Sequence, residues 1–109
     1  MLVTDKMVQN AFDYLTEAAS KAAVARAMRI KAEYRLKQTK AKLMMEMQGA
    51  IALREAQAEI HPDYSKALGV LIEAVEQDEL HRHRKDTAIA IIEAWRTEQA
   101  NHRNSARVG

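Results

Sequence analysis

Cations crowd residues 21–42, and their side chains could bind a polyanion. This segment carries eight lysines and arginines against one acidic residue, Glu33, a net charge of +7 in 22 residues. Cations on one helix repel each other, so this density indicates a partner with many negative charges, most often a phosphate backbone. Lys and Arg spread over several turns can follow phosphates without reading bases. The predicted nucleic-acid-binding residues are Arg26, Arg29, Lys31, Arg35, Lys37, Lys40 and Lys42, with Arg82, Arg84 and Lys85 in a second basic cluster.

Charge is segregated along the chain, which keeps a second use of the cations open. The net charge is +2 over the 109 residues, yet residues 43–80 carry eight acidic and only two basic side chains. Acidic segments of another subunit or of a protein partner could pair with the basic segment. Nucleic-acid contact is favoured because exposed helices ordinarily intersperse Glu with Lys, whereas here Glu33 stands alone. A plain solvated face is the third interpretation.

Histidines and carboxylates around residue 80 are of the types that bind metals, but their spacing is wrong. His81 and His83 are two positions apart, so on a helix they point in different directions, unlike the four-residue spacing of a helical zinc pair. Asp78-x-x-His81 occurs once, where a carboxylate-bridged di-iron bundle needs two such motifs. We therefore expect no metal site. Protonation of either histidine below about pH 6.5 would modestly strengthen anion binding.

Catalysis has little support in the residues. The chain has no cysteine, which excludes disulfides, thiolate catalysis and cysteine-based zinc sites. It has no glycine-rich phosphate loop, no serine nucleophile with a plausible base and no paired carboxylates on an apolar background. We expect a protein that is not an enzyme and that uses no cofactor.

Long helices must position these side chains, because the chain has only three glycines and one proline to make turns. We predict an all-α fold, a long antiparallel helical hairpin that forms one domain over residues 1–101 and assembles into an oligomeric helical bundle or coiled coil. The predicted elements are a first helix over about 5–60, a turn at 61–62, a second helix over about 62–101 and a flexible tail over 102–109. Thr4 and Asp5 can cap the first helix, and Pro62 suits the first position of the second.

Two stretches leave the number of helices open at two or three. Gly49 is the weak point of the first helix, and a bend there would give a compact three-helix bundle. Residues 76–87 contain one apolar side chain, Leu80, so the second helix is either exposed or broken there. Continuity is favoured, because neither Gly nor Pro marks a stop.

An apolar stripe near the N-terminus predicts contact between subunits. A hairpin folded at residues 61–62 would place position 82 near position 41, which brings the second basic cluster beside the first. Residues 1–20 would then extend beyond the second helix with no partner in the same chain. Burying a large apolar side chain is worth about 1.5–3 kcal/mol, so we expect this stripe to pair with another copy. The predicted oligomer interface is Val8, Phe12, Leu15 and Ala19.

Two apolar strips separate the cations around the basic helix, at 100° of rotation per residue. The first strip is Ala23, Ala27, Ile30, Tyr34, Ala41 and Met45, and the second is Ala25, Ala32, Leu36 and Leu43. A helix with two apolar seams is usually packed on both, so we expect neighbours on both sides. Tyr34 is expected in a seam rather than stacked on an unpaired base. Trp95 is expected to anchor packing rather than to stack on a base.

The sequence carries no sign of a membrane or export signal. No apolar run approaches the roughly 18 residues that a membrane span needs. The N-terminus lacks a basic region followed by a hydrophobic core. We expect a soluble cytoplasmic protein that makes no membrane contact.

Three features carry a resemblance to a known group. They are the long basic helix, the break at His61-Pro62-Asp63-Tyr64, and a second helix ending in Glu93-Ala94-Trp95-Arg96-Thr97 followed by Gln99-Ala100-Asn101. This layout resembles small helical proteins of tailed bacteriophages, some of which are compared with UvsY-like recombination mediators. The resemblance implies a homo-oligomer in the cytoplasm of the bacterial host, which binds single-stranded DNA, loads a recombinase and helps to displace single-strand-binding protein. No DNA-binding residue of that family is transferred to this chain.

These patterns lead to two functional hypotheses. The first is a non-enzymatic, phage-encoded accessory protein that binds single-stranded DNA through its basic helix in recombination or replication. The alternative is a phage-encoded protein-binding module that inhibits a host or defence protein by covering an acidic or nucleic-acid-binding site. Binding to DNA that weakens steeply as salt rises would favour the first.

Overall fold

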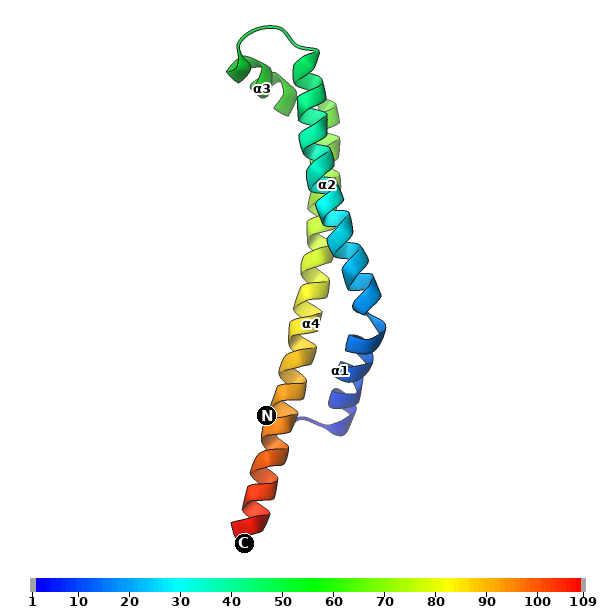
Figure 1. The fold of residues 1–109 in the computed structure, drawn as a ribbon, viewed down its shortest axis with the longest axis vertical. Coiled ribbons are helices and arrows are strands. Elements are labelled where there is room, and N and C mark those ends of the chain that lie inside the picture. Colours follow the sequence, from blue (N-terminus) through cyan, green and yellow to red (C-terminus); the bar gives the residue numbers. More distant parts are fainter. Residues whose placement is uncertain (1, 109) are drawn as a thin grey trace. The chain divides into compact units, whose positions relative to one another are not determined.

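The computed structural model describes residues 2–108, and within them it has four helices and no strand (Figure 1). The predicted all-α fold is confirmed. The helices are α1 (Asp5–Glu17), α2 (Ala19–Met45), α3 (Ile51–Glu59) and α4 (Pro62–Val108). Within these residues, no helix is both long enough and apolar enough to cross a membrane.

The predicted continuous helix over residues 5–60 is wrong, because the chain leaves the helix twice. Thr4 does cap α1, and its side chain accepts a hydrogen bond from the Met7 backbone N–H. At Ala18 the backbone bends and α1 ends, although the Ala18 N–H still donates to the Tyr14 carbonyl and the Ala22 N–H to the Ala18 carbonyl. Neither Gly nor Pro explains this break. The second interruption covers residues 46–50, where Gly49 has φ +109°, a conformation that side chains with a Cβ rarely adopt. The weak point at Gly49 is therefore a full break.

The second predicted helix is confirmed and is longer than expected. α4 begins at Pro62 and runs without interruption through residues 76–87, as favoured from the absence of Gly and Pro. Its start is capped by His61, whose Nδ1 accepts a hydrogen bond from the Asp63 backbone N–H at 3.0 Å. Residues 102–108, expected to form a flexible tail, continue the helix.

Contacts divide the chain into two compact units. The hairpin unit is Ala23–Glu79, and the α1 unit is Met1–Ala22 with Leu80–Gly109. α2 and α4 each contribute to both units.

In the hairpin unit, α2 runs antiparallel to the first part of α4 (Figure 1). Small side chains let the helices approach closely. The buried apolar residues of this unit are Ala25, Ala32, Leu43 and Ala58. Three of the four are alanines, so the core is as thin as the composition suggests.

The pairing register of this hairpin differs from the predicted one. Arg29 of α2 contacts Asp78 and Glu79 of α4, and Lys42 shares a groove with the first turn of α4. Position 41 therefore lies beside the start of α4, and the predicted alignment of position 82 with position 41 is wrong. The cause is the segment between α2 and α4, which folds as a loop and α3 instead of extending the first arm.

The N-terminal stripe finds its partner within the chain. In the α1 unit, Ala11 forms a buried cluster with Ala88 and Ile92 of α4, and Leu15 packs against it. The members of the predicted oligomer interface divide: Val8 is buried and Leu15 half-buried, whereas Phe12 and Ala19 are exposed. The premise that this stripe lacks an intrachain partner is wrong, because breaks at Ala18 and 46–50 shorten the first arm.

Two polar contacts also hold α1 and its leading residues to α4. The Tyr14 hydroxyl donates a hydrogen bond to the His81 carbonyl oxygen at 3.2 Å. The backbone N–H of Val3, a buried residue, donates to both carboxylate oxygens of Glu98 at 3.1 and 3.2 Å. The α1 unit is thus closed by contacts at both ends of α1.

Candidate nucleic-acid interface

The outward face of α2 is apolar along its centre. Ala25, Ala32 and Leu43 turn one side of α2 toward the hairpin core, so the strip on the opposite side of the helix points away from it. This outer strip consists of Ala23, Ala27, Ile30, Tyr34, Ala41 and Met45. The exposed fractions of Ile30, Tyr34 and Met45 are 57%, 64% and 85%. Of the two seams that we expected to be packed, one is buried and the other, with Tyr34, is exposed.

Cations border the outer strip on both sides, and the two borders differ in their surroundings. At 100° per residue the predicted residues fall into two groups. We call Lys31, Arg35 and Lys42 the groove flank, and Arg26, Arg29, Lys37 and Lys40 the paired flank.

Carboxylates hold the inner members of the paired flank. The Arg29 guanidinium lies 3.2 Å from Glu33 and 3.1 Å from both Asp78 and Glu79. Hydrogen bonds to these carboxylates, with Glu33 the largest contributor, raise the pKa of Arg29. Asp78 is the one buried charged residue among those that the structure describes, so Arg29 supplies the cation that its carboxylate needs.

Lys40 is held in the same way by α3. Its ammonium group lies 3.0 Å from a carboxylate oxygen of Glu59, and this hydrogen bond raises the pKa of Lys40. Arg29 and Lys40, both predicted as nucleic-acid-binding residues, thus form ion pairs within the hairpin unit. Arg26 and Lys37 are exposed on the same flank and make no ion pair with any residue in 2–108.

The cations of the groove flank are not paired with carboxylates of the described residues. Lys31, Arg35 and Lys42 are all exposed, and none of them forms an ion pair within the described part of the chain. Arg35 and Lys42 line a groove of about 470 Å³ between α2 and the first turns of α4. Lys66 of α4 lines the same groove and brings a third cation to it.

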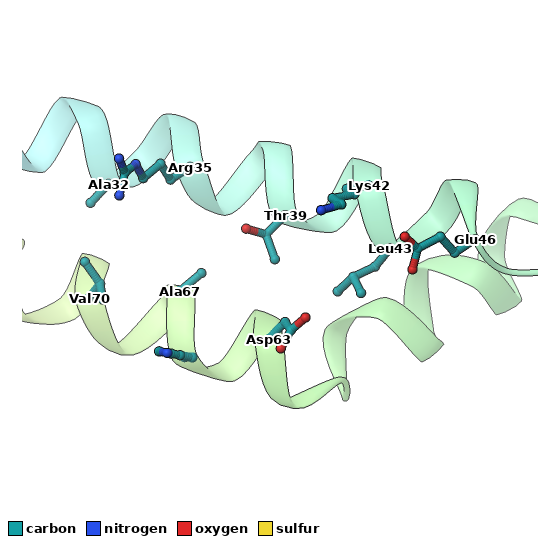
Figure 2. A pocket seen from close by; sticks show the side chains of 10 residues that line it. Ala32, Arg35, Thr39, Lys42, Leu43, Glu46, Asp63, Ala67 and Val70 are labelled. Carbon is teal, nitrogen blue, oxygen red and sulfur yellow. The ribbon is translucent and has the colours of Figure 1, made fainter.

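The groove is lined by four apolar residues and six polar or charged residues (Figure 2). Leu43 of α2 and Ala67 of α4 project into the space between the helices, as does Thr39 (Figure 2). Two carboxylates, Glu46 and Asp63, share the margin with the three cations.

Lys66 was missed from the sequence because the predicted register was wrong. The signal that could have found it is Gly49: a break there, followed by a short third helix, brings the start of α4 rather than residue 82 beside Lys42. Local charge alone gives no indication, since Lys66 stands isolated between Ser65 and Ala67 in a segment that is acidic overall.

The second basic cluster lies in the α1 unit. Arg82, Arg84 and Lys85 are exposed on α4. Lys85 borders a small apolar cavity of about 210 Å³ whose other lining includes Tyr14 and Leu15. Trp95, half-buried in the same unit, fits the predicted role of a packing residue better than that of an exposed platform.

The residues considered as metal ligands differ in their contacts and in their exposure to solvent. Asp78 is bound by Arg29, and His81 is half-buried while His83 is exposed. Within residues 2–108 no group of three or more His, Cys, Asp or Glu side chains is arranged to hold a metal ion.

Comparisons of this chain with protein-family models, with curated proteins and with solved structures found no match.

Proposed function

We propose that this chain is a non-enzymatic accessory protein that binds single-stranded DNA along the outward face of α2. The observation that carries the proposal is the exposed apolar strip with unpaired cations on its border. Lys31, Arg35 and Lys42 offer charge to phosphates, and Tyr34, 64% exposed, offers a ring to a base.

The apolar strip favours a single strand over a duplex. A duplex presents mainly its phosphates to a helix that lies along its backbone, which would leave Ile30, Tyr34 and Met45 without a partner. A single strand presents phosphates and unstacked bases together, so the same face could contact both. Stacking on an aromatic side chain is tolerant of sequence, because every base has a π-face.

A titration at several salt concentrations tests the proposal. If Lys31, Arg35, Lys42 and one further cation each neutralise a phosphate, log K should fall with log salt with a slope of about −3. The measurement is fluorescence anisotropy with one labelled oligonucleotide, as a single strand and as a duplex with its complement. Tighter binding of the single strand supports the proposal, and no binding of either form at about 50 mM salt rejects it.

The wider context of the proposal is recombination or replication in a phage-infected bacterium. It rests on the resemblance to UvsY-like recombination mediators, which also suggests a homo-oligomer, a cytoplasmic location and contact with a recombinase or single-strand-binding protein. Phe12 and Ala19 are the members of the predicted oligomer interface that remain exposed, since Val8 is buried and Leu15 packs against the cluster with α4.

One observation favours the alternative, a protein-binding module that inhibits a host or defence protein. An apolar strip bordered by cations also fits an amphipathic helix with acidic borders, as in heterotypic coiled coils. The same titration separates the two, because a module that recognises only an acidic helix binds neither form of DNA.

A further inference from the structure

The groove between α2 and α4 carries five charged side chains that do not pair with one another. Arg35, Lys42 and Lys66 bring three positive charges, and Glu46 and Asp63 bring two negative charges. No ion pair within 4.0 Å joins any of these five side chains to another. The groove therefore has a net charge of +1, which one phosphodiester neutralises.

The walls and the size of the groove suit a base. Ala32 and Leu43 of α2 and Ala67 and Val70 of α4 supply the apolar part of its lining, beside six polar or charged residues. Its volume of about 470 Å³ falls within the roughly 300–1,000 Å³ of small-molecule sites.

We infer that the groove seats one nucleotide of a bound single strand and discriminates between bases. The cations hold its phosphate, the base lies on the apolar wall, and Glu46 or Asp63 accepts hydrogen bonds from an amino group of the base. This inference rests on the proposed function and assigns a chemical preference to it. Carboxylates accept hydrogen bonds from the N4 amino group of cytosine, whereas thymine presents O4, an acceptor, at the same position.

The preference for cytosine is therefore set by the carboxylates and the affinity by the cations. Because Glu46 and Asp63 would face an acceptor when thymine is bound, their negative charges oppose thymine and favour cytosine. A neutral side chain in place of Lys66 would weaken the binding of cytosine and thymine oligonucleotides alike. The two sets of residues can thus be tested separately.

The experiment compares oligo(dC) and oligo(dT) of equal length by fluorescence anisotropy at pH 7.5. Both bases stack weakly, so stacking within the free strand contributes little to the difference. We expect the wild-type protein to bind oligo(dC) about fivefold more tightly, and Glu46→Ala with Asp63→Ala to bring the two Kd values together. Lys66→Gln should weaken both oligonucleotides and leave their ratio unchanged.

Each outcome decides one claim. Binding of neither oligonucleotide rejects the proposed function itself. Binding of both, with weakening in Arg35→Gln and a ratio that the double variant leaves unchanged, overturns the nucleotide seat alone. Asp63 lies in the first turn of α4, so its replacement also affects the start of that helix. Glu46 lies outside the helices, so Glu46→Gln alone repeats the test without this effect. Circular dichroism spectra of all variants check that the helices are retained.

Discussion

The two flanks of α2 carry cations in similar number and differ in what those cations contact. On the paired flank, Glu33, Glu59, Asp78 and Glu79 lie against Arg29 and Lys40, so two of the four cations of that flank meet carboxylates, whereas Arg26 and Lys37 form no ion pair with any described residue. On the groove flank, Lys66 joins Arg35 and Lys42 at the groove, and Glu46 and Asp63 are the carboxylates among the residues that line it.

This difference separates cations that stabilise the fold from cations that are available to a ligand. A polyanion gains little from a cation that must first break an ion pair, because the released carboxylate then repels the phosphate. The net charge of residues 21–42 does not distinguish the two flanks, because the cations of both lie in this one segment. Only the neighbouring elements, α3 and α4, decide which cations remain available.

Removing two charges from each flank gives the largest expected contrast. We expect Arg35→Gln with Lys42→Gln to weaken single-stranded DNA binding by about 50-fold at about 50 mM salt and to reduce the salt slope by about 1.4, from the loss of counterion release at two phosphates. Arg29→Gln with Lys40→Gln removes the same charge and should leave the slope nearly unchanged. Anisotropy titrations at several salt concentrations measure both. Equal slopes for the two variants would show that the flanks do not differ in DNA binding.

The strip between the flanks should determine the preference for a single strand. Replacing Tyr34 by Ala removes an exposed ring, so we expect the affinity for single-stranded DNA to fall about tenfold and that for duplex to stay the same. Tyr34→Phe, which keeps the ring, is the matched control and should bind normally. Loss of affinity for both forms in Tyr34→Ala would indicate that the ring supports folding instead.

Stability should respond in the opposite sense to DNA binding. Arg29→Gln leaves the buried carboxylate of Asp78 without its arginine, and we expect the thermal midpoint Tm to fall by about 5 °C. Arg35→Gln, which breaks no ion pair, should melt like the wild type. Combining Arg29→Gln with Asp78→Asn removes the buried charge as well and should recover part of the loss. Thermal melts followed by circular dichroism measure these shifts, and an unchanged Tm in Arg29→Gln would remove the structural role of that pair.

The fold class and the elements of the second half were predictable because their signals are local. Pro62 marks the start of α4, and the absence of Gly and Pro carries it through residues 76–87. Gly49 was identified as the weak point, and its positive φ explains why the chain breaks there. The break at Ala18 has no such signal, because alanine is the best helix former and its neighbours are ordinary helical residues.

The candidate site depends on the register of the hairpin, and this register follows from the break at Gly49, which the sequence marks only as a weak point. Residues 46–50 form a connection and residues 51–59 form α3, so neither segment extends the arm that pairs with α4. The predicted unbroken arm placed the second basic cluster beside Lys42 and left Lys66 out of the predicted site. The cations of residues 21–42 do lie on one helix, α2, whereas carboxylates that contact Arg29 and Lys40 come from distant positions in the chain.

The smallest expected effect is the pH dependence of the Lys40 pair. The hydrogen bond to Glu59 raises the pKa of Lys40 above its ordinary value of 10.5, so the pair stabilises the folded state fully below pH 10.5 and loses this effect as pH rises through the raised pKa. A Lys40→Met variant lacks the pair at every pH. The difference in Tm between wild type and variant should be small, because solvent screens an exposed ion pair. It should be constant around neutral pH and should decrease above pH 10.5, as Lys40 loses its proton. Melts of both proteins from neutral to strongly alkaline pH test this, with Lys37→Met, which removes an unpaired cation of the same flank, as the control. A difference that grows with pH would contradict the assigned role of Lys40, since it would mean that the lysine stabilises the fold without its charge.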